Sequence, residues 1–107
     1  MERPELLIET QQGPDEVVFT LAGEIDMLTV TRLAAEVTEA IAESPHRIVL
    51  DMAGVTFCDS QGLGTLVVLS RKASHAQVVL MLANVGDFLL RVLDITGLRS
   101  ALVLSGA

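Results

Sequence analysis

A short segment, Asp59–Gly64, holds the residues most able to do chemistry in this sequence. It combines a hydroxyl, a carboxylate, an amide and two glycines, and its members are Asp59, Ser60, Gln61, Gly62, Leu63 and Gly64. The segment lies where a predicted strand passes into a predicted helix. Such junctions in open α/β sheets lie at the carboxyl edge of the sheet, where ligands usually bind. Ser60 is therefore the first candidate for a functional residue.

Local physics predicts a capping role for Ser60. Its hydroxyl can accept a hydrogen bond from a free backbone amide of the first helical turn, which makes it the predicted N-cap. Gly62 and Gly64 fall in the same turn, where each glycine costs up to about 1 kcal/mol relative to alanine. Glycines there indicate the close approach of another backbone or of a partner. A capping serine with glycines needed only for packing remains the alternative.

The residues around Ser60 do not favour catalysis by its hydroxyl. The segment Cys58–Gly62 lacks the first glycine of a nucleophile elbow. The two histidines, His46 and His75, fall in a predicted loop and at a predicted helix end, where we expect both to face solvent. A catalytic triad is therefore not predicted, and we expect this chain not to be an enzyme.

Cofactor and metal sites are not predicted either. Gly62–Gly64 begins a dinucleotide-binding pattern, but Val67 stands where the third glycine is needed, and no Walker loop is present. Cys58 is the single cysteine, so it can form no disulfide within the chain, and with two distant histidines it gives no metal-ligand spacing. We expect Cys58 to be a buried, unreactive thiol.

Composition narrows the class of partner. The net charge of -7 disfavours binding to the phosphate backbone of a nucleic acid, and the 3% aromatic content provides few rings on which bases could stack. No nucleic-acid partner is therefore expected. A basic protein surface is the better complement, although the acidity can also serve solubility alone. No signal-peptide pattern and no apolar run of membrane-spanning length is found. The expectation is a cytoplasmic protein without a membrane partner.

The first half of the chain is predicted to form a hairpin and a helix. Leu6–Thr10 and Val17–Ala22 are predicted strands, and the short connection between them favours antiparallel pairing. Gly23–Asp26 breaks the strand pattern. A helix follows, with Thr29 as its predicted N-cap and Ser44-Pro45 as its end.

The second half is predicted to alternate strands and helices. The apolar run in Arg47–Met52 indicates a strand buried on both faces, as in a parallel sheet, and Val55–Cys58 extends or follows it. Ala101–Leu104 fits either a short strand or the end of a terminal helix. The remaining predictions are a helix from Ser60 to about Ser74, a strand at Gln77–Leu82, and a helix at Val85–Ile95 with Asn84 as N-cap and Gly97 as stop.

These elements predict a single α/β domain over residues 1–107, with a mixed sheet of four to five strands and helices packed against it. The core should be aliphatic, because the chain has no Trp or Tyr and only three Phe.

Four segments resemble one known family in order and spacing. Asp59–Gly64 resembles the phosphorylation motif of STAS domains, in particular those of bacterial anti-sigma factor antagonists. Gly23–Asp26, Ile48–Asp51 and Val92–Leu98 are similar to the family's other motifs, and the four together cover most of the chain. Gln61 stands where many members carry serine or threonine.

The resemblance implies a regulatory binding protein. In that family the unphosphorylated antagonist binds an anti-sigma factor, which then releases its sigma factor for transcription. The anti-sigma factor is itself a serine kinase that phosphorylates the antagonist, here on Ser60, and a PP2C-type phosphatase reverses the modification. The resemblance also implies that Asp26 and Asp59 contribute to partner recognition, together with Ser60 and the residues that follow it up to Gly64. A STAS subunit or scaffold without a switch, for example in a lipid transporter, is the alternative.

Overall fold

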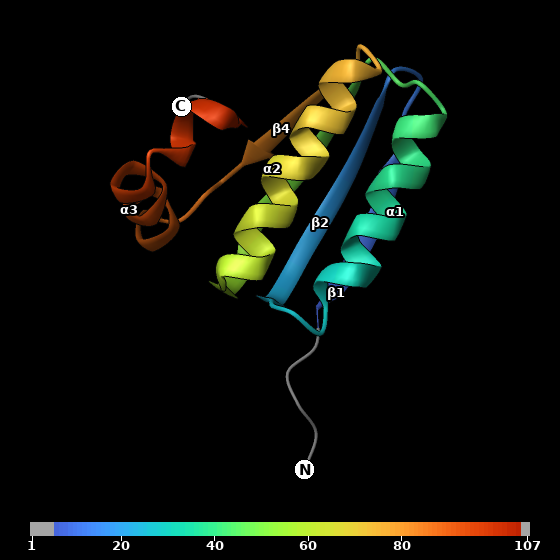
Figure 1. The fold of residues 1–107 in the computed structure, drawn as a ribbon. Helices are drawn as coiled ribbons and strands as arrows, with labels where there is room; N and C mark the ends of the chain where they lie inside the picture. Colours follow the sequence, from blue (N-terminus) through green and yellow to red (C-terminus); the bar gives the residue numbers. More distant parts are fainter. Residues whose placement is uncertain (1–5, 106–107) are drawn as a thin grey trace.

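The computed structural model describes residues 6–105, so the two ends of the predicted 1–107 domain lie outside the described residues (Figure 1). The chain alternates strands and helices along its length. The elements are β1 (Leu7–Gln12), β2 (Glu16–Ile25), α1 (Val30–Ala42), β3 (Arg47–Cys58), α2 (Ser60–His75), β4 (Val79–Ala83), α3 (Asp87–Thr96), the 3-10 helix η1 (Leu98–Ala101) and β5 (Val103–Leu104).

The five strands form one mixed sheet in the order β1-β2-β3-β4-β5. β1 and β2 pair antiparallel, which confirms the predicted hairpin, and the three other pairings are parallel. The predicted α/β fold with a mixed sheet is therefore confirmed, with five strands. For Ala101–Leu104 the sequence allowed either a short strand or the end of a helix, and the segment contains both. Ala101 ends η1, and Val103–Leu104 form the short edge strand β5.

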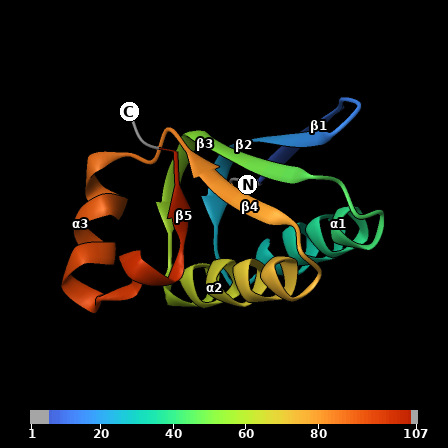
Figure 2. The same cartoon turned by 90° about the horizontal axis from the view of Figure 1, so that it is seen from above.

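Helices α1 and α2 lie side by side on one face of the sheet, while α3 lies at the β5 end (Figures 1 and 2). The core between these layers is aliphatic, as predicted: within residues 6–105, Phe19 is the single aromatic side chain among the buried hydrophobic residues. Alternate residues of the central strands supply the layer beneath the helices, including Leu21, Ile48, Leu50 and Leu82, each at most 1% exposed. No helix in this part of the chain combines the length and apolar character needed to cross a membrane.

One predicted boundary is wrong because a neighbouring strand overrides local sequence. Gly23–Asp26 was predicted to break the strand, but its first three residues belong to β2, where Gly23 has a φ of +118° and the register with β3 shifts on either side of it. β3 is one continuous strand to Cys58, so it supplies hydrogen-bond partners to this irregular end of β2. The register pairs Ile25 with Cys58. The two longest strands thus end next to each other.

Asn84 is not the N-cap of α3. Its backbone is left-handed, with a φ of +57°, and its side-chain amide donates to Asp51 Oδ1 at 3.0 Å. That bond, with a second from the Ala53 amide, lowers the pKa of Asp51 from its ordinary value. The helix begins only at Asp87, after Gly86. Gly97 is the predicted stop, with a φ of +76° at the helix C-cap.

Candidate functional site

The site is built where β2 and β3 end. Because Ile25 and Cys58 are paired in parallel register, the chain segments that follow them leave the sheet at the same edge. The amide of Asp59 donates to the carbonyl of Ile25 at 3.0 Å, which continues this pairing beyond the last strand residue. The loop after β2 (26–29) and the start of α2 are therefore held next to each other.

Asp59, not Ser60, is the N-cap of α2. Its backbone is extended, with φ -86° and ψ -176°, and its Oδ1 accepts from the Gly62 amide at 2.8 Å. Ser60 is the first helical residue and is exposed. Within residues 6–105 its hydroxyl makes no hydrogen bond. The capping role predicted for Ser60 belongs to Asp59. The Ser60 hydroxyl is therefore not used by the helix cap.

The second carboxylate oxygen of Asp59 reaches across to the other loop. Oδ2 accepts from the amide of Met27 at 3.2 Å, while Oδ1 holds Gly62. We call this pair of hydrogen bonds the Asp59 clamp. It joins the loop before α1 to the first turn of α2, so the two segments flanking Ser60 are fixed relative to each other.

Asp26 stabilises the same loop from inside. It is 8% exposed, and its Oδ1 accepts from the amides of Leu28 at 2.9 Å and Thr29 at 3.0 Å. Thr29 occupies the predicted N-cap position of α1, but its side chain makes no capping bond; its Oγ1 accepts from the Asp26 amide and donates to the Glu24 carbonyl. The role predicted for Asp26 in partner recognition stays a prediction, and its burial favours an effect through loop shape.

The two glycines of the motif differ in their surroundings. A Cβ on Gly62 would lie 2.7 Å from Ile25 Cγ2 and 2.8 Å from the Ile25 carbonyl oxygen, so no side chain fits there. The prediction that another backbone segment lies close to Gly62 is therefore confirmed, and that segment is the end of β2. Gly64 is exposed, and a Cβ there would meet nothing within 4 Å. Packing against the described residues therefore does not explain why position 64 is a glycine.

The remaining predicted site residues fall on opposite sides of α2. Leu63 is 7% exposed and belongs to the core, so it supports the helix from beneath. Gln61 is exposed beside Ser60. Ser60, Gln61 and Gly64 border a groove of about 490 Å³ on the α2 surface, which also includes Ala34 of α1 and runs as far as Lys72.

Exposed apolar residues next to this groove were not predicted. Met27 and Leu28, in the loop held by the Asp59 clamp, are 66% and 60% exposed, and Val68 on α2 is 50% exposed. We call Met27, Leu28 and Val68 the apolar rim. Two adjacent large apolar residues inside a loop, between Asp26 and Thr29, were the sequence signal that could have identified it.

Cys58 lies beneath the motif and is half-buried. Burial, and then the charge of Asp59, raises the pKa of its thiol to about 11. The group is therefore protonated near neutral pH and is a poor nucleophile. This agrees with the expected unreactive thiol, although the side chain is less buried than predicted.

The two histidines, which could act as a base toward the Ser60 hydroxyl, lie far from it. His75 ends α2, and fifteen residues of helix place it about 22 Å along the axis from Ser60. His46 precedes β3, at the strand end opposite to the motif. Both histidines are exposed, as predicted. Among residues 6–105 no group of three or more His, Cys, Asp or Glu side chains could hold a metal ion.

We predict opposite effects for alanine at the two glycines. Gly62→Ala should destabilise the domain by about 1–3 kcal/mol, because the new methyl group must displace Ile25. Gly64→Ala, its matched control in the same helix, should be neutral or stabilising by up to about 1 kcal/mol. Urea unfolding followed by circular dichroism measures both. Equal destabilisation by the two substitutions would contradict the packing described for Gly62.

The Asp59 clamp can be tested one oxygen at a time. Asp59→Asn keeps one acceptor for the Gly62 amide, since Asn caps helices about as well as Asp, but it presents an NH2 group to Met27. We expect faster hydrogen exchange at the Met27 amide and little change at Gly62. Asp59→Ala should release both amides and cost about 1 kcal/mol. An unchanged Met27 exchange rate in Asp59→Asn would show that the clamp does not hold this loop.

Comparison with known proteins identifies relatives along almost the whole described chain. Residues 7–105 match the family model of the STAS domain. An anti-sigma-B factor antagonist of Staphylococcus epidermidis is 31% identical over 94 residues, which covers 88% of this chain and 87% of that protein.

Solved structures show the same fold. An anti-sigma factor antagonist from Mycobacterium paratuberculosis superposes with a TM-score of 0.84 at 25% identity, over 96% of this chain and 87% of that one. SpoIIAA in its unphosphorylated form gives a TM-score of 0.76 at 22% identity, over 94% and 89% of the two chains. The phosphorylated form of the Bacillus SpoIIAA gives 0.72 at 22% identity, over 94% and 92%. The chain belongs to the STAS domain family.

Proposed function

We propose that this chain, taken as one STAS domain over residues 1–107, is an anti-sigma factor antagonist whose binding is switched off by phosphorylation of Ser60. The observation that carries the proposal is the free hydroxyl of Ser60. It is exposed at the first position of α2, while Asp59 supplies the helix cap in its place. A kinase can therefore modify Ser60 without removing a hydrogen bond on which the fold depends.

The start of α2 is suited to accept a phosphate. Phosphorylation adds about -1.5 to -2 charge units at pH 7. The amides and the dipole at a helix N-terminus favour a negative charge within this chain. The fold also suits both states in a relative, since SpoIIAA has been solved in unphosphorylated and phosphorylated forms that share this architecture. We therefore expect phosphorylation to alter the surface and to leave the domain folded.

The surface around Ser60 suits a partner that reads a neutral hydroxyl. The exposed residues around it are uncharged: Met27 and Leu28 of the apolar rim, with Gln61 and Gly64 on α2. The adjacent Asp59 carboxylate is half-buried and accepts hydrogen bonds from two backbone amides. A partner that covers the apolar rim must remove water from the neighbouring Ser60 side chain. A phosphate at that position would then be desolvated without a matching cation, which is unfavourable. Phosphorylation thus opposes docking most strongly where the apolar contact is best.

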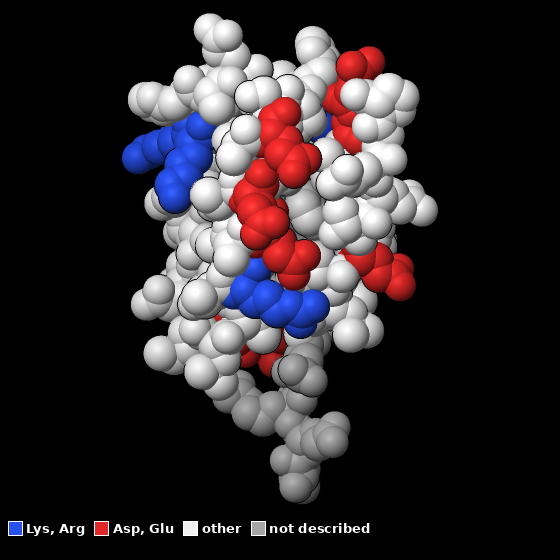
Figure 3. Space-filling view, turned by 90° about the vertical axis from the view of Figure 1, so that its right-hand side faces the viewer, with Lys and Arg blue, Asp and Glu red and all other residues white. Residues whose placement is uncertain are grey.

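An acidic stripe on one face of the molecule favours a basic partner (Figure 3). Three glutamates of α1 lie on the side of that helix that faces β1 and β2, namely Glu36, Glu39 and Glu43. Charged surfaces of this kind steer an oppositely charged partner toward the docking site, and they do so less at high salt. The proposed partners are an anti-sigma factor that acts as a serine kinase and a PP2C-type phosphatase that restores the hydroxyl. This function places the protein in the cytoplasm, with neither nucleic acid nor membrane as a direct partner.

The proposal predicts distinct behaviour for variants at Ser60. A purified anti-sigma factor kinase from the same genome, with ATP, should add one phosphate to the wild-type protein and none to Ser60→Ala. Ser74→Ala, at an exposed serine near the other end of α2, is the matched control and should be phosphorylated normally. Ser60→Ala should bind the kinase in the presence of ATP, whereas Ser60→Asp should bind at least about tenfold more weakly than the wild type, about 1.4 kcal/mol. Mass spectrometry and calorimetry give the two readouts.

Two results would contradict the switch. Phosphate found on Ser60→Ala would place the modification elsewhere. Equal affinity of the wild type, Ser60→Ala and Ser60→Asp would mean that charge at this position does not control binding. Stable association with a transporter complex, insensitive to substitution at Ser60, would instead favour the STAS subunit or scaffold without a switch.

A further inference from the structure

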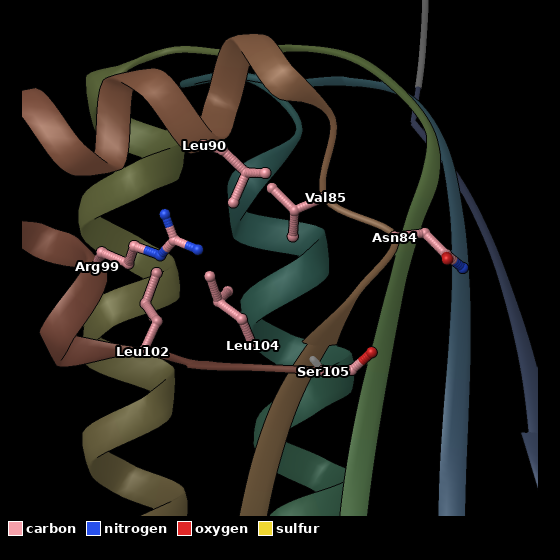
Figure 4. Close-up of a pocket in the computed structure, with 7 residues that line it drawn as sticks. All are labelled: Asn84, Val85, Leu90, Arg99, Leu102, Leu104 and Ser105. Atoms are coloured by element: carbon pink, nitrogen blue, oxygen red, sulfur yellow. The ribbon is translucent and has the colours of Figure 1, made fainter. Parts of the chain in front are cut away.

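A second concave site lies at the β5 side of the molecule, where the connection from β4 to α3 faces the chain between η1 and β5 (Figure 4). Its volume is about 570 Å³, and small-molecule sites typically measure roughly 300–1,000 Å³. None of its lining residues belongs to the Asp59 clamp, the apolar rim or the groove beside Ser60. The proposed switch leaves this cavity without a role.

Four aliphatic side chains contribute to the walls of the cavity. Val85 and Leu90 line one side, and Leu102 and Leu104 line the other. All four are buried or half-buried, so their positions are set by packing against the rest of the domain. Among residues 6–105 no aromatic ring lines the cavity, so these residues offer no stacking surface to a nucleobase or another flat ring. The four side chains suit a flexible hydrocarbon chain.

Among residues 6–105, one cationic side chain lines the cavity, and it is half exposed to solvent. The guanidinium of Arg99 lies between Leu90 on one side and Leu102 and Leu104 on the other (Figure 4). Its Nη1 donates to both carboxylate oxygens of Asp94, at 3.1 and 3.2 Å. Its Nε and Nη2 have no hydrogen-bond partner among residues 6–105. Arginine stays charged at any physiological pH, and its paired N–H groups match the two oxygens of a carboxylate.

The other polar groups of the cavity lie at its edge. The Asn84 side chain turns away from the aliphatic walls and donates to Asp51 (Figure 4). Ser105 carries its hydroxyl on the same edge, also directed outward. The interior thus offers one charged fork and four hydrocarbon side chains. That combination selects a molecule with one anionic end and an otherwise apolar body.

We propose that this cavity binds an amphipathic carboxylate, in which an aliphatic chain lies against Val85, Leu90, Leu102 and Leu104 and the carboxylate accepts hydrogen bonds from Nε and Nη2 of Arg99. Asp94 has two opposing effects on this site. It orients the guanidinium through Nη1, and its negative charge competes with the ligand for the same cation. The site is independent of Ser60 phosphorylation.

Sodium octanoate is a suitable probe, titrated into the full chain with labelled Leu and Val methyl groups. We expect saturable chemical-shift changes at the methyl groups of the four wall residues, and little change at the core residues Leu33 and Leu66. Octanol has the same chain length without the charge. It should bind about tenfold more weakly, as expected for the loss of a charge-assisted hydrogen bond.

Variants at the ion pair distinguish this site from a merely apolar one. Arg99→Gln should weaken octanoate binding about tenfold, and Arg99→Lys, which keeps the charge but loses the fork, should give an intermediate affinity. Asp94→Asn should strengthen binding, because it removes the competing charge. Arg91→Gln, at an exposed arginine of α3 that does not line the cavity, is the control and should leave the affinity unchanged. Unchanged core methyl shifts verify that each variant is folded.

Three outcomes would overturn the proposal. The first is the absence of saturable shifts at the wall methyl groups. The second is octanol binding as tightly as octanoate, which would remove Arg99 from recognition. The third is an octanoate affinity in Arg99→Gln equal to that of the wild type, which would mean that the guanidinium does not receive the carboxylate.

Discussion

The two oxygens of the Asp59 carboxylate hold the proposed docking surface of this protein together. One caps α2 through the Gly62 amide, and the other fixes the loop before α1 through the Met27 amide. Both contacts depend on the parallel register that ends β2 at Ile25 beside Cys58. They also depend on the absence of a side chain at Gly62, where a Cβ would meet Ile25. The Asp59 clamp thus requires both the sheet register and the glycine at position 62. Ser60 lies between the segments that the clamp joins.

This arrangement separates the groups that maintain the fold from the group that the proposed phosphorylation would change. Asp59 caps the helix and Asp26 stabilises the loop, so neither task falls to the serine. Ser60 can therefore gain a charge without the loss of a structural hydrogen bond. The apolar rim, held in place through Met27, lies where docking would remove water from that charge. A small chemical change can then produce a large change in affinity while the energy of the folded core is little affected.

Much of this architecture follows from local sequence. The alternation of apolar runs and helical periods predicted the mixed sheet, and the motif at Asp59–Gly64 was correctly placed where a strand passes into a helix. The errors arose where nearby alternatives compete. Asp59 and Ser60 are both good N-caps, and only the extended backbone at Asp59 decides between them.

Asn84 is also a good N-cap by residue type, but its side-chain amide donates a hydrogen bond to Asp51 on a neighbouring strand. Gly23 breaks a strand by propensity, yet β3 supplies its pairing partner. The exposure of Met27 and Leu28 had one local signal, two adjacent large apolar residues in a loop, which does not by itself tell an exposed pair from a buried one.

The central claim is that phosphate on Ser60 changes the surface and leaves the fold intact. Amide hydrogen exchange, compared residue by residue between the unphosphorylated and the Ser60-phosphorylated protein, tests this claim most directly. The account predicts equal protection throughout β2, β3 and the rest of α2, with differences confined to the first turn of α2 and to the Met27–Leu28 loop. Loss of protection along α2 or in the central strands would contradict it, because phosphorylation would then act by unfolding the domain.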